Sequence, residues 1–394
     1  MDYKDLMKKY KVNQVTDEEK QFIEKEIEKY EAMEEYFSEN LDDELGNLEN
    51  IDDAKQNSHE TVQLKKSVDQ RLRKVILKSV LIAMGVWISI FYILSPLVDA
   101  FFYNPQKFSV GELDNDVSFD LAAVTELNMP GMSPSTVFVG RKGFGVYHLT
   151  YSYLDQFRGD FHDVSHVIRC GKIASTRQDL LLRFDPFENL RYYNDQKDIL
   201  KDLNENAMAD VEILNPVSYR SFSISFEEDL TLEELARLEE KYENIQFQWA
   251  AIRAGEKDEE RIEKLGMRLM GNRLMGALTG DEKIGEKYPA FSTMNWLVNN
   301  QVDVTDPANM AEGYEQHYFS LLEYVIDRGD NLEILEQREN KTILYKEALE
   351  YAKKEGIRIY GLVVYSEMRH IREFTENENL RLFDLNDAVA YKRY

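Results

Sequence analysis

Charged and apolar residues are intermingled along most of this chain, except in one stretch that has no charge at all. Residues 79–98 read SVLIAMGVWISIFYILSPLV, whereas 31% of the whole chain is charged. Twenty helical residues extend for about 30 Å, the thickness of a bilayer's hydrocarbon core. The stretch has no polar face, which favours a membrane-spanning helix over the alternative, a buried helix of a soluble domain.

The charges beside this stretch predict its orientation. Only one acid, Asp69, interrupts the basic residues that precede it, and acidic residues predominate after it. The basic residues are Lys65, Lys66, Arg71, Arg73, Lys74 and Lys78. Because basic residues stay on the cytoplasmic side, we expect a single-pass protein of the cell membrane, with residues 1–74 in the cytoplasm, 75–98 in the membrane and 99–394 outside. The stretch begins too late and is too long for a cleaved signal peptide.

The cytoplasmic segment contains a predicted amphipathic helix. Thr16 and Glu19 form a capping box at its start. The apolar positions then recur at intervals of three or four residues, opposite a face of glutamates. These positions are Ile23, Ile27, Tyr30, Met33, Phe37 and Leu41. The cytoplasmic segment is too small to offer this apolar stripe much surface to pack against. We therefore interpret the stripe as a partner-binding surface. The alternative is a small self-contained hairpin or a partly disordered arm.

The rest of the N-terminal half is expected to contain a link, a helix and a β-rich region. Residues 42–60 are acidic and aperiodic, which is typical of a flexible link, and helical character resumes at 61–78. Pro96 and Pro105 bracket the exit of the membrane helix. Within 99–215, residues 107–155 are interpreted as strands and turns. They include a hairpin of 136–139 and 145–151 around a turn at 140–143, whereas 161–200 carry no clear pattern.

The clearest local pattern lies in residues 216–394. Residues 222–226 alternate as a strand with one buried face, 227–230 turn, and a second capping box at Thr231 and Glu234 begins a helix that leads to a strand at 245–252. A second unit comprises a strand at 357–365, a helix at 367–375 and a strand at 380–385. These β-α-β units predict an α+β fold with ferredoxin-like halves. Between them lies a helical insertion at about 255–340, with helices around 291–298 and 314–335, followed by a helix at 346–354.

The charge and cysteine content narrow the class of function. The net charge is −25, which disfavours direct nucleic-acid binding and suits a basic partner, including a protein that itself binds DNA. Cys170 is the only cysteine, so the outer part cannot be held by an internal disulfide. An outer domain without disulfides fits a Gram-positive bacterial surface better than a disulfide-rich animal one.

Two pairs of stretches carry a resemblance to a known family. The first pair is LKKSVDQRLRKVILKSVLIAMGV at 64–86 and FFYNPQKFSVGELDNDVSFDLAAVTELNMPGM at 101–132. The second pair is SISFEEDLTLEELARLEEKYENIQFQWAAI at 223–252 and IRIYGLVVYSEMRHIREFTENENLRLFDLND at 357–387. In this order they resemble the N- and C-terminal parts of the transmembrane sigma-factor regulators of Gram-positive bacteria. Residues 255–340 have no counterpart in that resemblance.

The resemblance implies a membrane-anchored anti-sigma factor. The cytoplasmic segment would sequester an alternative sigma factor of the extracytoplasmic-function type, and the outer domain would sense envelope stress. The implied partners are the sigma factor, membrane lipid and other membrane or envelope proteins. The histidine-and-cysteine zinc motif of some anti-sigma factors is absent, and Cys170 lies on the other side of the membrane. No metal or other cofactor is therefore expected in the cytoplasmic segment.

Two other classes of function remain as alternatives. The first is a membrane-anchored extracytoplasmic binding or scaffold protein that does not bind a sigma factor. The second is an envelope enzyme that uses His162, Asp163 and His166, because two histidines four residues apart on a helix can bind a metal. Without a third ligand, a structural role for these residues is the favoured interpretation. The chain has neither a phosphate-binding glycine loop nor a G-x-S-x-G motif, and we expect no enzymatic activity.

Overall fold

The computed structural model describes residues 58–178, 185–255, 263–269, 282–329 and 341–389, together with Thr16 and scattered positions in 20–33 and 332–335. It divides into two compact units, Met1–Trp87 and Ile88–Tyr394. In the first unit, the described positions between Lys20 and Met33 are helical, as predicted. The Lys20 amide donates to the Thr16 carbonyl at 2.9 Å, while Glu19, the other half of the proposed capping box, lies outside the described residues.

A continuous helical stretch contains the predicted membrane span. It consists of α3 (Ser58–Ser89), a π-helical turn η1 (Ile90–Leu94) and α4 (Ser95–Phe101). Within it, Lys66–Phe101 is long and apolar enough to cross a membrane, which is consistent with a single-pass protein. The helix ends at Phe101, so Pro96 and Pro105 bracket its end as predicted, and Pro96 itself lies in the first turn of α4. Proline lacks an N–H, and the π-helical turn directly before it accommodates the missing hydrogen bond.

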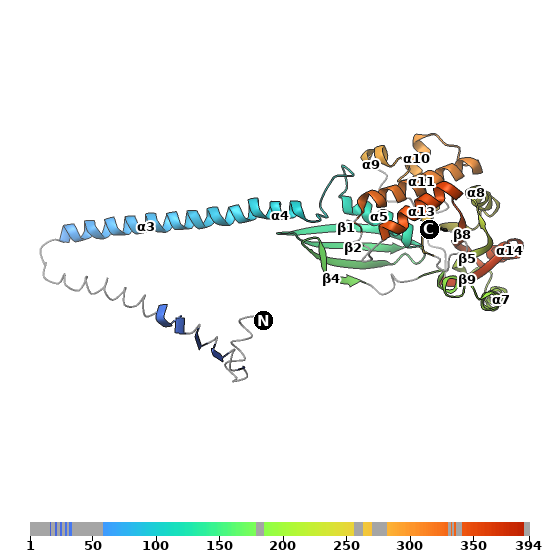
Figure 1. Ribbon diagram of the computed structural model, residues 1–394, viewed down its shortest axis with the longest axis horizontal. Coiled ribbons are helices and arrows are strands. Elements are labelled where there is room, and N and C mark those ends of the chain that lie inside the picture. Colours follow the sequence, from blue (N-terminus) through green and yellow to red (C-terminus); the bar gives the residue numbers. More distant parts are fainter. Residues whose placement is uncertain are drawn as a thin grey trace. The chain divides into compact units, whose positions relative to one another are not determined.

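The second unit contains two antiparallel sheets (Figure 1). The first is a meander whose strands pair in chain order: β1 (Met132–Gly143), β2 (Val146–Asp155), β3 (Phe161–Arg169) and β4 (Lys172–Gln178). The predicted hairpin is confirmed, but its turn is not at 140–143. The chain reverses at Phe144 and Gly145, which both have positive φ. Glycine adopts this conformation without strain, so Gly145 sets the position of the turn.

The second sheet has the strand order β7-β6-β8-β5-β9. Its strands are β5 (Tyr219–Leu230), β6 (Gln246–Ile252), β7 (Gly266–Arg268), β8 (Ile359–Glu367) and β9 (Leu380–Val389). Helix α8 (Leu232–Lys241) joins β5 to β6, and α14 (Met368–Asn377) joins β8 to β9, so both predicted β-α-β units are present. In each unit the two strands are parallel, and one strand of the other unit lies between them.

The capping box at the start of α8 has the predicted geometry. The Glu234 amide donates to Thr231 Oγ1 at 3.2 Å, and the Thr231 amide donates to Glu234 Oε2 at 2.7 Å. Each residue satisfies a backbone group of the other that the helix itself leaves unpaired. The preceding residues 227–230, expected to be a turn, are instead the last residues of β5.

Strand β5 is buried on both faces, so the prediction of one buried face is wrong. Phe222 and Ile224 pack into a core with α8 and α14, but Ser221, Ser223 and Ser225 are buried as well. The second face is covered by a separate cluster that includes residues of α6 (Glu188–Tyr192) and α7 (Lys197–Ile213). Helix α6 lies within 161–200, the segment in which the sequence carried no clear pattern, and α7 begins at its end.

Residues 116–128 form a helix where strands and turns were predicted. Ten of the thirteen residues of α5 (Asp116–Asn128) are buried, among them two aspartates. Helix α5 contacts both sheets, through β1 and β7. Its backbone accepts a hydrogen bond from Trp249 of β6, whose Nε1 donates to the Glu126 carbonyl at 2.7 Å. The two sheets therefore share one core around α5.

The helical insertion contributes to this core. It contains α9 (Glu282–Lys287), α10 (Thr293–Asn299) and α11 (Pro307–Arg328), and α13 (Lys341–Glu355) follows it. Helix α11 buries Tyr314, Tyr318 and Tyr324 and contacts α5, α8, α10 and α13 (Figure 1). The helices predicted near 291–298, 314–335 and 346–354 are confirmed within the described residues.

Candidate functional site

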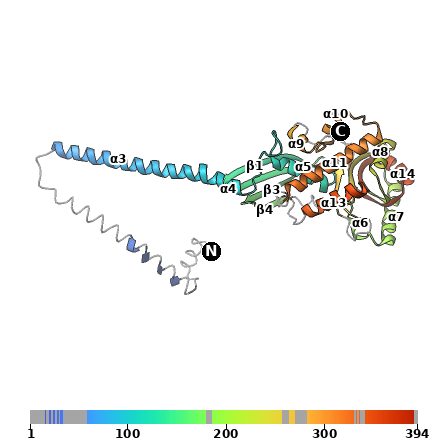
Figure 2. The same ribbon diagram turned by 45° about the horizontal axis from the view of Figure 1, so that its top comes forward.

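The end of the candidate membrane-spanning helix meets the tip of the β1–β2 hairpin (Figure 2). The ring of Phe91, in η1, packs edge-to-face on that of Phe144 in the hairpin turn, with centroids 5.6 Å apart. Such a contact between aromatic rings contributes about 1 kcal/mol beyond simple burial. It joins the apolar surface of the helix to the four-stranded sheet.

Two buried polar side chains of α4 bind the same turn. Ser95 is 2% exposed and accepts a hydrogen bond from the Phe144 amide at 2.9 Å, and Asp99 is 7% exposed and accepts one from the Gly145 amide at 2.7 Å. The second oxygen of Asp99 accepts from Arg141 Nε at 2.7 Å. The carboxylate thus has a charged partner and a backbone partner, as a buried carboxylate requires.

The hairpin tip is also connected to the next hairpin and to the core. The Cys170 amide, in the turn between β3 and β4, donates to the Gly145 carbonyl at 2.8 Å. Along β2, Tyr147 and Leu149 are fully buried in the core that α5 and the five-stranded sheet share. We call the contacts of Phe91, Ser95 and Asp99 with the β1–β2 tip the junction. It is a directional connection, because hydrogen bonds and an ion pair fix the helix end relative to the sheet.

Removing the Asp99 carboxylate is expected to loosen the junction. In Asp99→Ala the Gly145 amide and Arg141 lose their acceptor, and a hydrogen bond to a charged group contributes about 1.5–3 kcal/mol. Hydrogen exchange measured by mass spectrometry on the full chain in nanodiscs should then become about ten- to hundredfold faster in a peptide that covers 143–147. Asp160→Ala removes an exposed aspartate in the turn between β2 and β3 and should leave that rate unchanged. Equal exchange in wild type and Asp99→Ala would contradict the junction.

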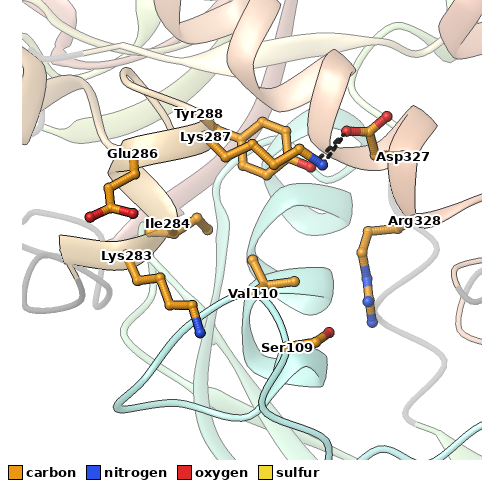
Figure 3. Close-up of a pocket in the computed structure, with 9 residues that line it drawn as sticks. All are labelled: Ser109, Val110, Lys283, Ile284, Glu286, Lys287, Tyr288, Asp327 and Arg328. Carbon is orange, nitrogen blue, oxygen red and sulfur yellow. Dashed lines mark hydrogen bonds and ion pairs between the residues drawn. The ribbon is translucent and has the colours of Figure 1, made fainter.

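A pocket of about 550 Å³ lies beside the linker that follows α4 (Figure 3). The residues that line it come from this linker, from α9 and from the end of α11: Ser109, Val110, Lys283, Ile284, Glu286, Lys287, Tyr288, Asp327 and Arg328. Lys287 Nζ lies 2.8 Å from a carboxylate oxygen of Asp327, so its charge is balanced within the wall. The pocket therefore offers a mixed polar and apolar surface.

Arg328 closes a buried network behind this pocket. Its Nε and one terminal nitrogen donate to the two oxygens of Asp120 at 2.6 and 2.7 Å, and Tyr324 donates to the same carboxylate at 2.7 Å. Its other terminal nitrogen lies 3.3 Å from Asp116. Burial raises the pKa of Asp120, and the guanidinium opposes that rise. The network fixes α11 to α5.

Asp116 also holds the linker in place. Its carboxylate accepts hydrogen bonds from the Ser109 and Val110 amides at 2.6 and 2.9 Å. Burial opposes the ionisation of Asp116, but these hydrogen bonds and a further one from the Ser109 hydroxyl outweigh it and lower its pKa. The same carboxylate therefore connects the segment after α4 to the helical core.

His162 and His166 do not lie on a helix, as the metal site considered above would require. His162 and His166 lie on strand β3, where residues four apart are separated by about 13 Å along the strand. His166 Nε2 lies 2.9 Å from the Tyr151 hydroxyl and Nδ1 lies 3.0 Å from Thr176 Oγ1, and burial lowers its pKa. Both ring nitrogens therefore have partners in the sheet. Across the described residues, no three potential metal ligands form a group.

The structure describes few of the predicted partner-binding residues. Met33 lies on the described helical positions and is 52% exposed, whereas Ile23, Ile27, Tyr30, Phe37 and Leu41 lie outside the described residues. The basic residues before the span lie on α3, and those whose side chains are described are exposed: Lys66, Arg71, Arg73, Lys74 and Lys78. Lys65 is helical, and its side chain is not described.

The fold defines an α+β domain that directly follows an apolar helix able to span a membrane. Within that domain, residues 211–387 match the family model "Sigma factor regulator C-terminal". The match supports the assignment of this chain to the sigma factor regulator family. The family indicates an anti-sigma factor role and a sigma factor as partner. Neither the curated proteins nor the solved structures give a match to the chain.

Proposed function

We propose that this protein is a membrane-anchored anti-sigma factor whose cytoplasmic segment, residues 1–74, sequesters an alternative sigma factor of the extracytoplasmic-function type. The observation that carries the proposal is the family match of residues 211–387, on a domain that follows a helix able to cross the membrane. The acidic amphipathic helix would cover a basic surface of the sigma factor, with its apolar stripe as the anchor and its glutamates as the rim.

The proposed orientation of the chain in the membrane rests on the charged residues beside the span. The basic residues of α3 from Lys66 to Lys78 are exposed and precede the charge-free stretch, as expected for a cytoplasmic entry. The second unit would then be the extracytoplasmic sensory domain, in a Gram-positive envelope. Its strand order β7-β6-β8-β5-β9, with two interleaved β-α-β units, supports a ferredoxin-like description of the sheet with β7 as an added edge strand.

The junction offers a route for the signal. A stimulus that displaces the four-stranded sheet would move α4, because Phe144, Gly145 and Arg141 bind Phe91, Ser95 and Asp99. Rigid connections transmit such displacements, whereas a flexible linker would absorb them. In this proposal, envelope stress shifts the helix end, and the captured sigma factor is released on the cytoplasmic side.

A transcription reporter in the host tests this function. Deleting the gene should raise transcription from promoters of one alternative sigma factor, and the full chain should restore repression. A variant that lacks residues 1–60 but keeps the basic residues before the span should insert in the membrane and fail to repress. If deletion leaves the reporter of every alternative sigma factor unchanged, the rival function, a membrane-anchored binding or scaffold protein, replaces the proposal.

A further inference from the structure

The tips of the two hairpins in the four-stranded sheet carry a concentration of positive charge. Two of the basic residues end β1, and two face each other across the turn between β3 and β4: Arg141, Lys142, Arg169 and Lys172. The two tips are adjacent, since the Cys170 amide donates to the Gly145 carbonyl at 2.8 Å. In a chain of net charge −25, this grouping departs from the overall composition.

Three of these cations are available to a partner. Arg141 is bound to Asp99 at 2.6 Å, but Lys142, Arg169 and Lys172 are exposed and form no ion pair with any residue that the structure describes. Unpaired cations gathered on one surface produce a local positive potential, which favours an anionic ligand and weakens with salt.

The position of the tips identifies the ligand. The turn of the first hairpin packs on Phe91, and Gly171, in the turn of the second, lies close to the Tyr103 backbone. From Phe91 to Phe101 the helix rises about 15 Å, so the tips lie along the last turns of the candidate span, where hydrocarbon gives way to lipid headgroups. Phe101 is 84% exposed at this level, as aromatic residues of a membrane interface are.

We propose that Lys142, Arg169 and Lys172 bind the headgroups of anionic phospholipids in the leaflet where the membrane helix ends. Lysine and arginine at a membrane surface extend their charged ends to lipid phosphates while their aliphatic parts remain near the acyl boundary. Binding holds the hairpin tips on the bilayer and so fixes the angle between helix and sheet at the junction. This surface is independent of sigma-factor binding and of which side of the membrane the outer domain occupies.

The lone cysteine provides a probe at the required place. Cys170 is exposed, lies between Arg169 and Lys172 and is the only cysteine of the chain, so a nitroxide reports on this surface alone. The full chain is reconstituted in vesicles of phosphatidylcholine alone or of phosphatidylcholine mixed equally with phosphatidylglycerol. The accessibility of the label to a water-soluble nickel chelate is then measured by electron paramagnetic resonance.

The expected result is a lower accessibility in the anionic vesicles. Each basic residue near an anionic surface favours the bound state about fivefold, so three favour it about a hundredfold at low salt. Raising the salt to about 1 M shortens the screening length from about 10 to 3 Å and should restore the accessibility seen in phosphatidylcholine. Equal accessibility of wild type in the two kinds of vesicle would overturn the proposal, and this comparison needs no variant.

A triple variant assigns the effect to these side chains. Lys142→Gln, Arg169→Gln and Lys172→Gln together should give the same accessibility in both kinds of vesicle. The matched control changes three exposed lysines elsewhere in the same unit: Lys197→Gln, Lys201→Gln and Lys346→Gln. The control should keep the difference between vesicles. A triple variant at the tips that still responds to phosphatidylglycerol would also overturn the proposal.

Discussion

Replacing Ile27 and Phe37 with aspartate is expected to weaken binding of the sigma factor by about a thousandfold and to switch on its promoters. Each side chain is an anchor of the predicted apolar stripe, and the loss of such an anchor costs about 2 kcal/mol. Two anchors together correspond to a factor of about 10³, since each 1.4 kcal/mol is tenfold. The measurement is the dissociation constant of the full chain in nanodiscs for the sigma factor, together with the promoter activity in cells.

The control for this double variant keeps the added charge and moves it to the other face. Gln21 and Ala32 are exposed and lie opposite the stripe by the 3.6-residue period, so Gln21→Asp and Ala32→Asp should leave binding within a few-fold of wild type. If the stripe variant represses as wild type does, the interface lies elsewhere, and residues 61–74 become the leading candidate.

Replacing Arg328 with methionine is expected to destabilise the second unit by about 3–5 kcal/mol. The change leaves the Asp120 and Asp116 carboxylates buried without their cation, and removing one partner of a buried ion pair is costly for this reason. Urea unfolding of the full chain in detergent, followed by tryptophan fluorescence, measures the loss as a lower midpoint at unchanged slope.

Two further variants separate charge from packing at Arg328. Adding Asp120→Asn to Arg328→Met removes the main uncompensated charge and should recover part of the lost stability. Arg369→Met removes an exposed arginine that pairs with Glu367 at 2.8 Å and should cost no more than about 1 kcal/mol. A cost for Arg328→Met as small as that for Arg369→Met would show that the buried network does not stabilise the unit.

Helices and strands whose hydrophobic period and capping residues are visible in the local sequence were predictable. The charge-free span, the capping box of Thr231 and Glu234, and the strands of the two β-α-β units follow local rules of period and capping. The confirmed hairpin of β1 and β2 belongs to the same group. Its turn was misplaced because glycines at 140, 143 and 145 all permit a reversal, and the pairing of Gly143 with Val146 leaves Phe144 and Gly145 as the turn.

Elements defined by distant partners were not predictable. Helix α5 is buried almost all round, so it has no amphipathic period, and both of its buried aspartates contact Arg328, more than 200 residues away. The serines of β5 indicated a solvent face, but Phe187 and Leu190, from the segment without a pattern, cover it. Strand β9 was placed correctly by its own apolar residues.

The junction was missed for a related reason. Asp99 is the first charged residue after the charge-free stretch, so in the sequence it indicated only the orientation of that stretch. Its hydrogen bonds to the hairpin tip were not expected. Its partner Arg141 lies 42 residues further along the chain, at the end of a hairpin. No local pattern connects an acid at a helix end to an arginine at a hairpin tip. Only the folded arrangement brings the candidate membrane-spanning helix and the sheet together.

Direct binding between the full chain and a sigma factor is the decisive measurement for the proposed anti-sigma role. The protein is purified in nanodiscs, and each alternative sigma factor of its host is titrated against it, with the primary sigma factor as the reference. If the protein is an anti-sigma factor, one alternative sigma factor should bind saturably and one-to-one, and the Ile27→Asp, Phe37→Asp variant should lose this binding. Binding of no alternative sigma factor, or equal binding of wild type and that variant, would contradict it.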